Sequence, residues 1–202
     1  PLVDYTQIQY DAATGVVTLP EGMEIDLGSV AKGYAGQLAA QMLREHGVQS
    51  ALLNLGGNVQ TVGAKPDGSP WQIGIKDPQG EDAMMVLSVE DQAVVTSGGY
   101  ERYFEQDGQT YWHIMDPSTG HPADSGLISV TIVGDEGVVC DGLSTALFVM
   151  GLEKAADLWA QSGDFEAVFV TASGEVYITE GLRDRFALTE QYADTPVSVI
   201  KR

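Results

Sequence analysis

The chain has 202 residues, of which 44% are hydrophobic and 19% charged, a composition that supports a buried core and excludes a disordered tail. Its 29 acidic and 10 basic residues give a formal net charge of −19, which argues against nucleic acid and anionic membrane surfaces as partners. No run approaches the ~20 apolar residues of a transmembrane segment and no signal peptide is recognised, while the single Cys140 rules out an internal disulfide.

Short apolar runs separated by turn residues predict many strands and few helices, all within one domain over residues 1–202. Strands are expected near 15–19, 50–54, 59–63, 71–76, 84–89, 93–97, 109–115, 128–133, 166–171 and 175–179. Helices are expected near 29–46, 141–150 and 152–162. This order predicts an α+β domain with a largely antiparallel sheet and two main helical regions.

The first predicted helix follows the sequence DLGSVAKGYA at 26–35, in which Ser29 is the expected N-cap. Its apolar face is expected from Val30, Leu38, Met42 and Leu43. A helix start rich in unpaired N–H groups, with Lys32 nearby, attracts phosphate, although the spacing of a Walker loop is absent. An ordinary capped helix with a solvated Lys32 is the simpler alternative.

Two glycine-containing segments follow strand-like runs. The sequence NLGGN at 54–58 permits close approach of the backbone to a ligand, or a tight hairpin, and the hairpin is the simpler interpretation. The segment at 96–103 places Thr96, Ser97 and Gly98 after a strand and before aromatic and charged residues, so a planar ligand is expected to rest there.

The segment HIMDPSTG at 113–120 ends an apolar run with an imidazole, a carboxylate and a rigid turn. Asp116 and Thr119 are expected to bond the loop to itself, and Gly120 permits a left-handed backbone. His113 is therefore expected at a fixed strand end, where side chains suit catalysis. A well-made turn below a structural histidine is an equally good interpretation of this segment alone.

The sequence DGLST at 141–145 is expected to open the second helix. Asp141 and Thr145 are four residues apart, so both oxygens project from one helix face and can contact a single hard cation such as magnesium. The alternative is a carboxylate favoured by the helix dipole and a threonine bonded to its own turn. Cys140 is expected to be a small buried residue, because an acidic neighbour raises the pKa of a thiol.

Taken together, these segments resemble the ApbE family of FAD:protein FMN transferases, formerly called thiamine biosynthesis lipoproteins. The motifs that carry the resemblance cover most of the chain in one order: 26–35, 52–63, 71–78, 94–105, 111–122 and 141–151. The resemblance implies an ApbE-like, T-fold-related domain. It makes the Ala31 carbonyl, Asp141 and Thr145 the magnesium ligands, with His113 and Lys32 as catalytic residues. It implies a flavin nucleotide site formed by Lys32, Asn54, Gly56, Gly57, Thr96, Ser97, Gly98, His113, Asp116 and Thr119.

The implied reaction transfers FMN from FAD to a threonine or serine hydroxyl of an acceptor protein and releases AMP, and it uses Mg²⁺, with Ca²⁺ as a substitute. The implied acceptor is a flavoprotein subunit of a membrane redox complex, displayed on the extracytoplasmic face of a bacterial membrane, where the protein itself is periplasmic or lipid-anchored. Two rivals remain open: hydrolysis of FAD to FMN and AMP at the same site, and a flavin-binding protein without turnover.

The chain departs from the family pattern at three positions. It has Gln37 where members usually carry an acid, Asn58 where they often have aspartate, and Gly142 where they often have alanine. These changes leave the expected metal ligands intact but alter the charge around them. The chain begins at Pro1, and the family's N-terminal segment, which helps to enclose the flavin, is expected to be missing, so weak FAD binding is expected of this piece.

Overall fold

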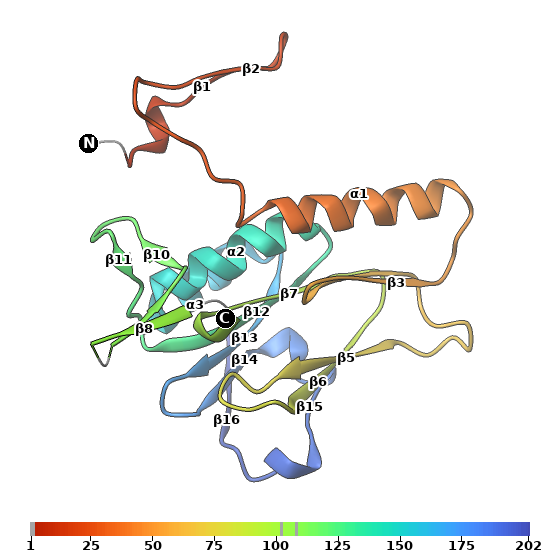
Figure 1. Ribbon diagram of the computed structural model, residues 1–202. Helices are drawn as coiled ribbons and strands as arrows, with labels where there is room; N and C mark the ends of the chain where they lie inside the picture. Colours follow the sequence, from red (N-terminus) through yellow and green to blue (C-terminus); the bar gives the residue numbers. More distant parts are fainter. Residues whose placement is uncertain (1–2, 102, 108) are drawn as a thin grey trace.

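The computed structural model describes residues 3–101, 103–107 and 109–202, and its centre is a seven-stranded sheet (Figure 1). The strand order is β16-β14-β13-β12-β7-β4-β3. The strands are β3 (Ala51–Leu55), β4 (Asn58–Val62), β7 (Ala93–Gly98), β12 (Leu127–Gly134), β13 (Glu166–Thr171), β14 (Val176–Thr179) and β16 (Val197–Ile200). All neighbours are antiparallel except β14 and β16, which confirms the predicted largely antiparallel α+β fold.

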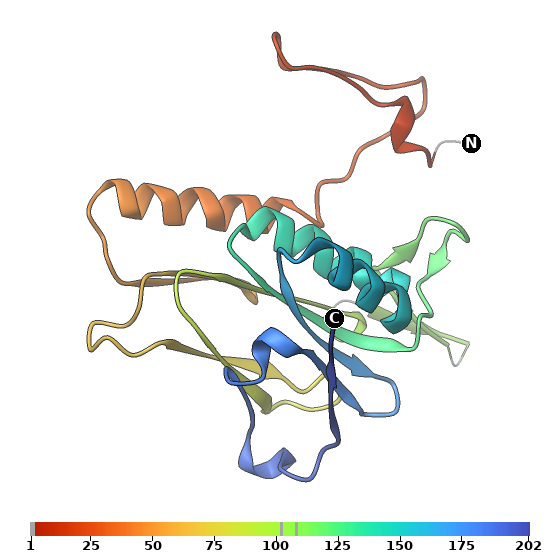
Figure 2. The ribbon, with the colours of Figure 1, turned by 180° about the vertical axis from the view of Figure 1, so that it is seen from behind.

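Two layers cover the two faces of this sheet (Figures 1 and 2). On one face lie α1 (Ala31–Glu45), α2 (Gly137–Met150) and α3 (Leu152–Ser162). On the other lies a three-stranded sheet of β5 (Trp71–Lys76), β6 (Ala83–Val89) and β15 (Phe186–Leu188). A strand in such a sandwich alternates its side chains between two apolar layers, so its sequence is hydrophobic at successive positions.

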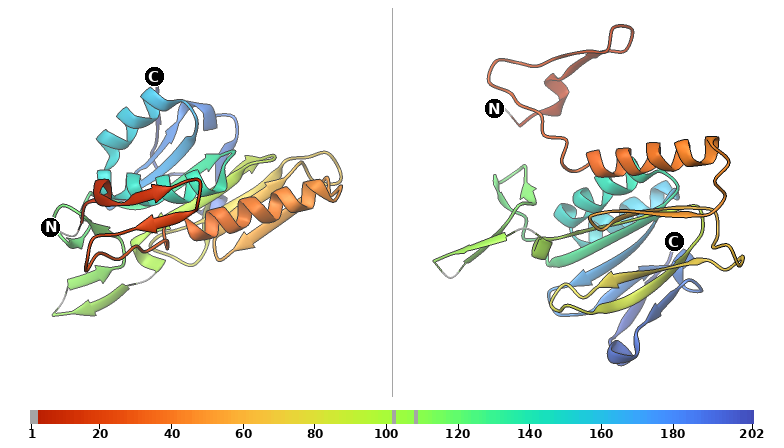
Figure 3. Two further views of the ribbon diagram at one scale, coloured as in Figure 1. Left: turned by 90° about the horizontal axis from the view of Figure 1, so that it is seen from above. Right: turned by 45° about the vertical axis from the view of Figure 1, so that its right-hand side comes forward.

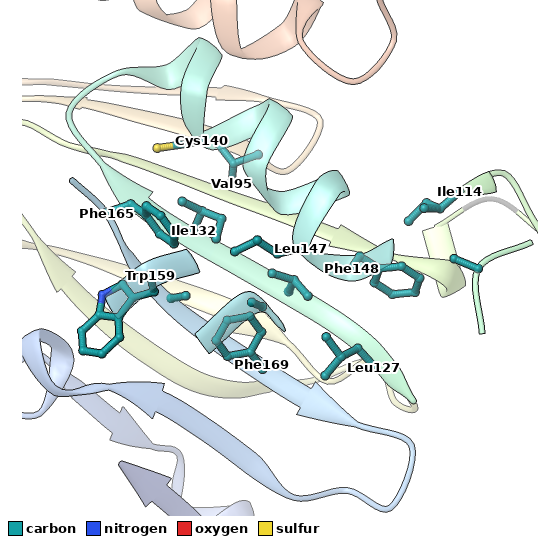
Figure 4. Packing of buried hydrophobic residues seen from close by; sticks show 14 of the residues in the cluster. Val95, Ile114, Leu127, Ile132, Cys140, Leu147, Phe148, Trp159, Phe165 and Phe169 are labelled. Atoms are coloured by element: carbon teal, nitrogen blue, oxygen red, sulfur yellow. The ribbon is translucent and has the colours of Figure 1, made fainter. Parts of the chain in front are cut away.

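The alternation divides the core into two clusters. Val95 pairs with Ile132 across β7 and β12, and both face the helices, where they pack with Leu147 and Phe148 of α2 (Figure 4). The next pair along the strands, Val94 and Val133, faces the three-stranded sheet. Any side chain of β7 is therefore assigned to the helical or the opposite layer by its position in the strand.

Small residues allow α1 to lie close to its neighbours. The buried positions of this helix are Gly33, Gly36 and Ala40, whereas the predicted apolar face was wrong, because Leu38 and Met42 are exposed. Ser29 is not the N-cap: Val30 occupies that position without a side-chain hydrogen bond. The helix is held by backbone approach to the layer beneath it and not by a stripe of large side chains.

Other boundaries also differ from the predictions. The second helix begins at Gly137, four residues before Asp141, because Gln37 of α1 supplies the acceptor for an early N–H group. The strand expected over 109–115 is broken into β9 (Gln109–Trp112) and β10 (Met115–Asp116). Sequence patterns missed β1 (Gln9–Asp11), β8 (Tyr103–Gln106), β11 (His121–Pro122), β15 and β16.

The N-terminal residues project from the body. The short helix η1 (Tyr5–Gln7) and the hairpin of β1 with β2 (Val16–Thr18) stand beyond the start of α1 (Figure 3), and the side chains of β1 and β2 are exposed. In the part of the chain that the structure describes, no helix combines the length and apolar character needed to cross a membrane. Position 102, within the motif at 94–105, lies outside the described residues.

Candidate active site

The helices α1 and α2 touch at a pair of glycines. A Cβ atom added to Gly33 would lie 2.2 Å from the Gly137 carbonyl oxygen and 2.6 Å from Cβ of Asp141. This contact allows the Gly33 N–H group to donate a hydrogen bond of 2.8 Å to Oδ2 of Asp141. The first turn of α1, which holds Ala31 and Lys32, is thereby fixed against the carboxylate of α2.

Polar side chains fill the layer beneath this crossing. Oε1 of Gln37 accepts a hydrogen bond of 3.1 Å from the Val138 N–H group, so this residue caps α2 from the neighbouring helix. Asn58 and Gln60 of β4 are buried and face the helices. Among the described residues, Nδ2 of Asn58 and Oε1 of Gln60 have no hydrogen-bond partner. Buried polar atoms of this kind mark a place where a ligand or water completes the structure.

Asp141 is a buried carboxylate, with 4% of its surface exposed. Burial raises its pKa, because the ionised form loses water, while the Gly33 N–H group, the charge of Lys32 and the nearby Asn58 amide, whose Nδ2 makes no direct hydrogen bond to the carboxylate, act in the opposite direction. Neither of the two ion pairs found among the described residues involves Asp141. A cation beside this carboxylate would restore the compensation that burial removes.

Thr145 lies one helical turn beyond Asp141 on α2. Its hydroxyl lies 3.2 Å from Oγ of Ser97 on β7, and Ser97 in turn lies 2.7 Å from Oγ of Ser144. Ser144 is fully buried and donates to the Asp141 carbonyl at 2.8 Å. Thr145 therefore lies on the sheet-facing side of α2, in contact with a residue of β7, whereas the Asp141 side chain one turn earlier contacts the start of α1.

The donor set fits a hard divalent cation. The described residues contain no group of three or more His, Cys, Asp or Glu arranged to hold a metal ion. One carboxylate (Asp141), one hydroxyl (Thr145) and one carbonyl (Ala31, two residues before Gly33) offer oxygen alone. Mg²⁺ suits so small an oxygen set, because it retains water and substrate phosphate in its shell.

The β7 segment contributes less than predicted. Ser97 faces the helices, but the adjacent Thr96 faces the other layer, where its hydroxyl lies 2.8 Å from that of Thr131. Gly98 and the following glycine lie under two aromatic rings, because a Cβ on Gly98 would lie 2.2 Å from the Tyr100 ring. The Tyr100 ring occupies the position beside Gly98, and a pocket of about 300 Å³ next to it is lined by Gly99, Tyr100, Tyr103 and Trp112, so a planar ligand at this segment stays a prediction.

The glycine pair after β3 forms a hairpin, as the simpler interpretation had it. Leu55 pairs with Asn58, and the two-residue loop between them has φ of 61° at Gly56 and 87° at Gly57. Oδ1 of Asn54 accepts from the Gly57 N–H group at 2.9 Å. These three residues build the turn that brings Asn58 to the layer below α1, and their direct contact with a flavin nucleotide stays a prediction.

His113 follows the last residue of β9, as expected for a strand end. Its neighbours are anchored: Nε1 of Trp112 donates to the Ala123 carbonyl at 3.1 Å, and the buried Ile114 accepts from the Ala123 N–H group at 2.9 Å. The Trp112 ring also meets Phe148 of α2 edge to face, with centroids 6.3 Å apart. The backbone of His113 is fixed near α2, and its side chain is exposed.

Asp116 and Thr119 organise the turn that follows, as predicted. The Asp116 carboxylate accepts from the N–H and hydroxyl groups of Ser118 at 2.8 and 2.7 Å, which lowers its pKa. Thr119 accepts from the His121 N–H group, and Gly120 has φ of 72°. Both predicted site residues are engaged within the loop.

Sequence reasoning missed Gly33, Ser144 and Gln60 as parts of the site. Only the glycine-rich start of α1 carried a signal, since a helix that buries glycine requires a close neighbour. Cys140 is buried as expected, and burial, then Asp135 and Asp141, raise the pKa of its thiol to about 12, which makes it a poor nucleophile.

The fold and site define a layered α+β domain with an anion-attracting helix start beside a buried carboxylate. The sequence model of the ApbE family matches residues 1–169, and the chain belongs to the ApbE family. It is 41% identical over 184 residues to the FAD:protein FMN transferase of Klebsiella pneumoniae (strain 342), covering 90% of this chain and 56% of that protein.

Solved structures agree with this placement. The ApbE protein of Thermotoga maritima matches with a TM-score of 0.83 and 38% identity, over 90% of this chain and 60% of that one. The apo form of the flavinyl transferase ApbE of Pseudomonas stutzeri matches with a TM-score of 0.72 and 34% identity, over 93% and 55%. The chain spans about half the length of the curated relatives it matches.

Proposed function

We propose that this chain carries the catalytic site of a Mg²⁺-dependent FAD:protein FMN transferase. Relatives that bear this name support the reaction. The observation that carries the proposal is the placement of Asp141: a buried carboxylate, without a salt bridge in the described chain, bonded to the first turn of α1. A phosphate-binding helix start and a cation ligand at one point suit a dinucleotide pyrophosphate.

The proposed metal ligands are the Asp141 carboxylate, the Thr145 hydroxyl and the Ala31 carbonyl. Bound Mg²⁺ would supply positive charge to the pyrophosphate and stabilise the charge that develops on its oxygens. Lys32 adds a second positive charge at the same helix start. With a net charge of −19, the protein repels FAD at long range, so this local compensation is necessary for binding.

In the proposed reaction, the hydroxyl oxygen of an acceptor threonine or serine attacks the phosphorus on the riboflavin side of FAD. A bond from oxygen to that phosphorus forms, the bond from phosphorus to the bridging oxygen breaks, and AMP leaves with the bridging oxygen. The hydroxyl proton passes to His113, whose anchored backbone supports a fixed position for a base. Positioning and charge compensation account for most catalysis of this kind.

The proposed acceptor is a flavoprotein subunit of a membrane redox complex, outside the cytoplasm, and the proposed location of the enzyme is periplasmic or lipid-anchored. These proposals rest on the family resemblance. Fractionation of the native organism tests the location. Recovery of the native protein in the cytoplasm would overturn it.

The reaction is tested by incubating the protein with FAD, Mg²⁺ and such a subunit, and measuring the subunit's mass together with released AMP. We expect equal molar amounts of attached FMN and AMP. AMP and free FMN without an acceptor would indicate hydrolysis instead, and retained flavin without AMP would indicate a binding protein. The variant Asp141→Asn is the negative control, since it keeps the acceptor for Gly33 but removes the charge.

A further inference from the structure

A line of three hydroxyl groups connects β7 to α2 beside the candidate metal site. Thr145 Oγ1 lies 3.2 Å from Ser97 Oγ, which lies 2.7 Å from Ser144 Oγ. Ser144 Oγ lies 2.8 Å from the Asp141 carbonyl oxygen. Each hydroxyl has one proton and can accept as well, so the direction of every bond in the line is determined by its end.

The end of the line is a carbonyl, which only accepts. Ser144 must therefore use its single proton to donate to the Asp141 carbonyl. Ser97 must then donate to Ser144, and Thr145 must donate to Ser97, because Ser97 has no second proton. The proton of Thr145 is thus directed toward the sheet, and the lone pairs of its oxygen are left on the remaining side.

We propose that Ser97 and Ser144 are positioning residues that orient the Thr145 hydroxyl as a neutral ligand for a divalent cation. This inference rests on the metal site proposed above and extends it to residues that do not touch the metal. A threonine whose proton pointed at the cation would repel it. Because Ser97 accepts the Thr145 proton on the sheet side, the proton does not point at the cation. The hydroxyl is already oriented before the metal binds, so binding does not pay the entropic cost of orienting it.

Calorimetric titration with MgCl₂, in the presence of AMP, tests the proposal without reference to turnover. Ser97→Ala removes the acceptor of the Thr145 proton, and we expect Mg²⁺ affinity to fall by about tenfold. Ser97→Thr keeps the hydroxyl and is expected to restore binding. Ser144→Ala, at a fully buried position, is expected to weaken binding too, because it frees the Ser97 proton to point at Thr145.

Thr131→Val is the matched control, since it removes a buried hydroxyl that bonds to Thr96 in the same sheet but on the opposite face. We expect it to leave Mg²⁺ affinity unchanged. Thermal unfolding of each variant separates lost folding from lost binding. If Ser144→Ala fails to fold, the comparison of Ser97→Ala with Ser97→Thr decides.

The outcomes distinguish the proposed metal site from the proposed positioning role of Ser97 and Ser144. Wild-type protein that does not bind Mg²⁺ would overturn the metal site and the hydroxyl line with it. Wild-type binding that is lost in Thr145→Val but equal in Ser97→Ala would retain the metal site and overturn the positioning role. Equal losses in Ser97→Ala and Ser97→Thr would also overturn it, because a hydroxyl is present in one of them.

Discussion

Asp116 and Asp141 are two carboxylates in opposite situations. The Asp116 carboxylate is held by the hydroxyl and N–H groups of Ser118, two residues away in its own turn, and these bonds lower its pKa. Asp141 is held by a backbone N–H group 108 residues away, and burial raises its pKa. The turn around Asp116 can be predicted from neighbouring residues in the sequence. The surroundings of Asp141 cannot, because they form only when distant segments pack together.

The difference concerns function as well as folding. The local turn leaves His113 exposed on an anchored backbone. The packed layer presents a buried charge that remains without a salt bridge in the described chain. We interpret the first region as the provider of proton transfer and the second as the provider of charge compensation. Variants in either region should therefore impair one of these two functions and leave the other.

The largest effect is expected from His113→Ala. Loss of a general base typically costs 100- to 10,000-fold in rate, or roughly 3–5 kcal/mol in activation free energy. Mg²⁺ affinity should remain, because His113 is not a proposed metal ligand, and the bonds of Trp112 and Ile114 to Ala123 should keep the segment in place. Transfer rates and thermal unfolding measure both. An unfolded variant whose folded fraction keeps normal specific activity would make His113 a structural residue.

Asp141→Asn should separate metal binding from stability. In the wild type, ligand at 100 times its dissociation constant adds about 2.7 kcal/mol to the free energy of unfolding, and the variant should lose this increment. Asparagine is preferable to alanine here, because alanine would leave the buried Gly33 N–H group without an acceptor, at a cost of about 1–3 kcal/mol. Unfolding with and without Mg²⁺ measures the difference.

The difference in stability between the wild type and Asp141→Asn should depend on pH in a definite direction. Because the pKa of Asp141 is raised on folding, the metal-free folded state binds this proton more tightly than the unfolded state does. Its contribution to stability is greatest below the ordinary value of 3.8 and is lost as the pH rises through the folded pKa. The stability of metal-free Asp141→Asn relative to the wild type should therefore increase as the pH rises through the folded pKa of Asp141. A relative increase as the pH falls would contradict a raised pKa for Asp141.

Gly33→Ala should disturb the helix crossing by steric overlap. Its Cβ would lie 2.2 Å from the Gly137 carbonyl, and overpacking of this kind typically costs about 1–3 kcal/mol. Gly36→Ala is the matched control on the same buried face, because its nearest neighbour would be 3.7 Å away. Alanine there should gain up to about 1 kcal/mol from helix propensity. Denaturant unfolding of the two variants gives the comparison, and equal destabilisation would refute the crossing.

Sequence patterns predicted most helices and strands, but they did not predict which side chains meet between them. The i, i+4 spacing of Asp141 and Thr145 was sufficient to predict one helix face, because helix geometry is local. Which of the adjacent residues Thr96 and Ser97 faces the helices depends on how β7 is placed between the two layers, and the sequence does not show this placement. Large residues of α1 were predicted to be buried, yet glycines occupy its contact face, since that choice depends on how closely α2 approaches.

Asp116→Asn is expected to have the smallest effect and tests the local side of the division. The Asp116 carboxylate has a lowered pKa, so its contribution to stability is present above the ordinary value of 3.8 and is lost as the pH falls through the folded pKa. Asparagine keeps an acceptor for the Ser118 N–H group but gives up the charge. Global unfolding should barely change, while amide hydrogen exchange of Ser118 should quicken. Because the hydrogen bonds of Asp116 among the described residues stay within its own turn, Mg²⁺ affinity should stay equal to the wild-type value. A marked fall in affinity would show that the two carboxylates act together.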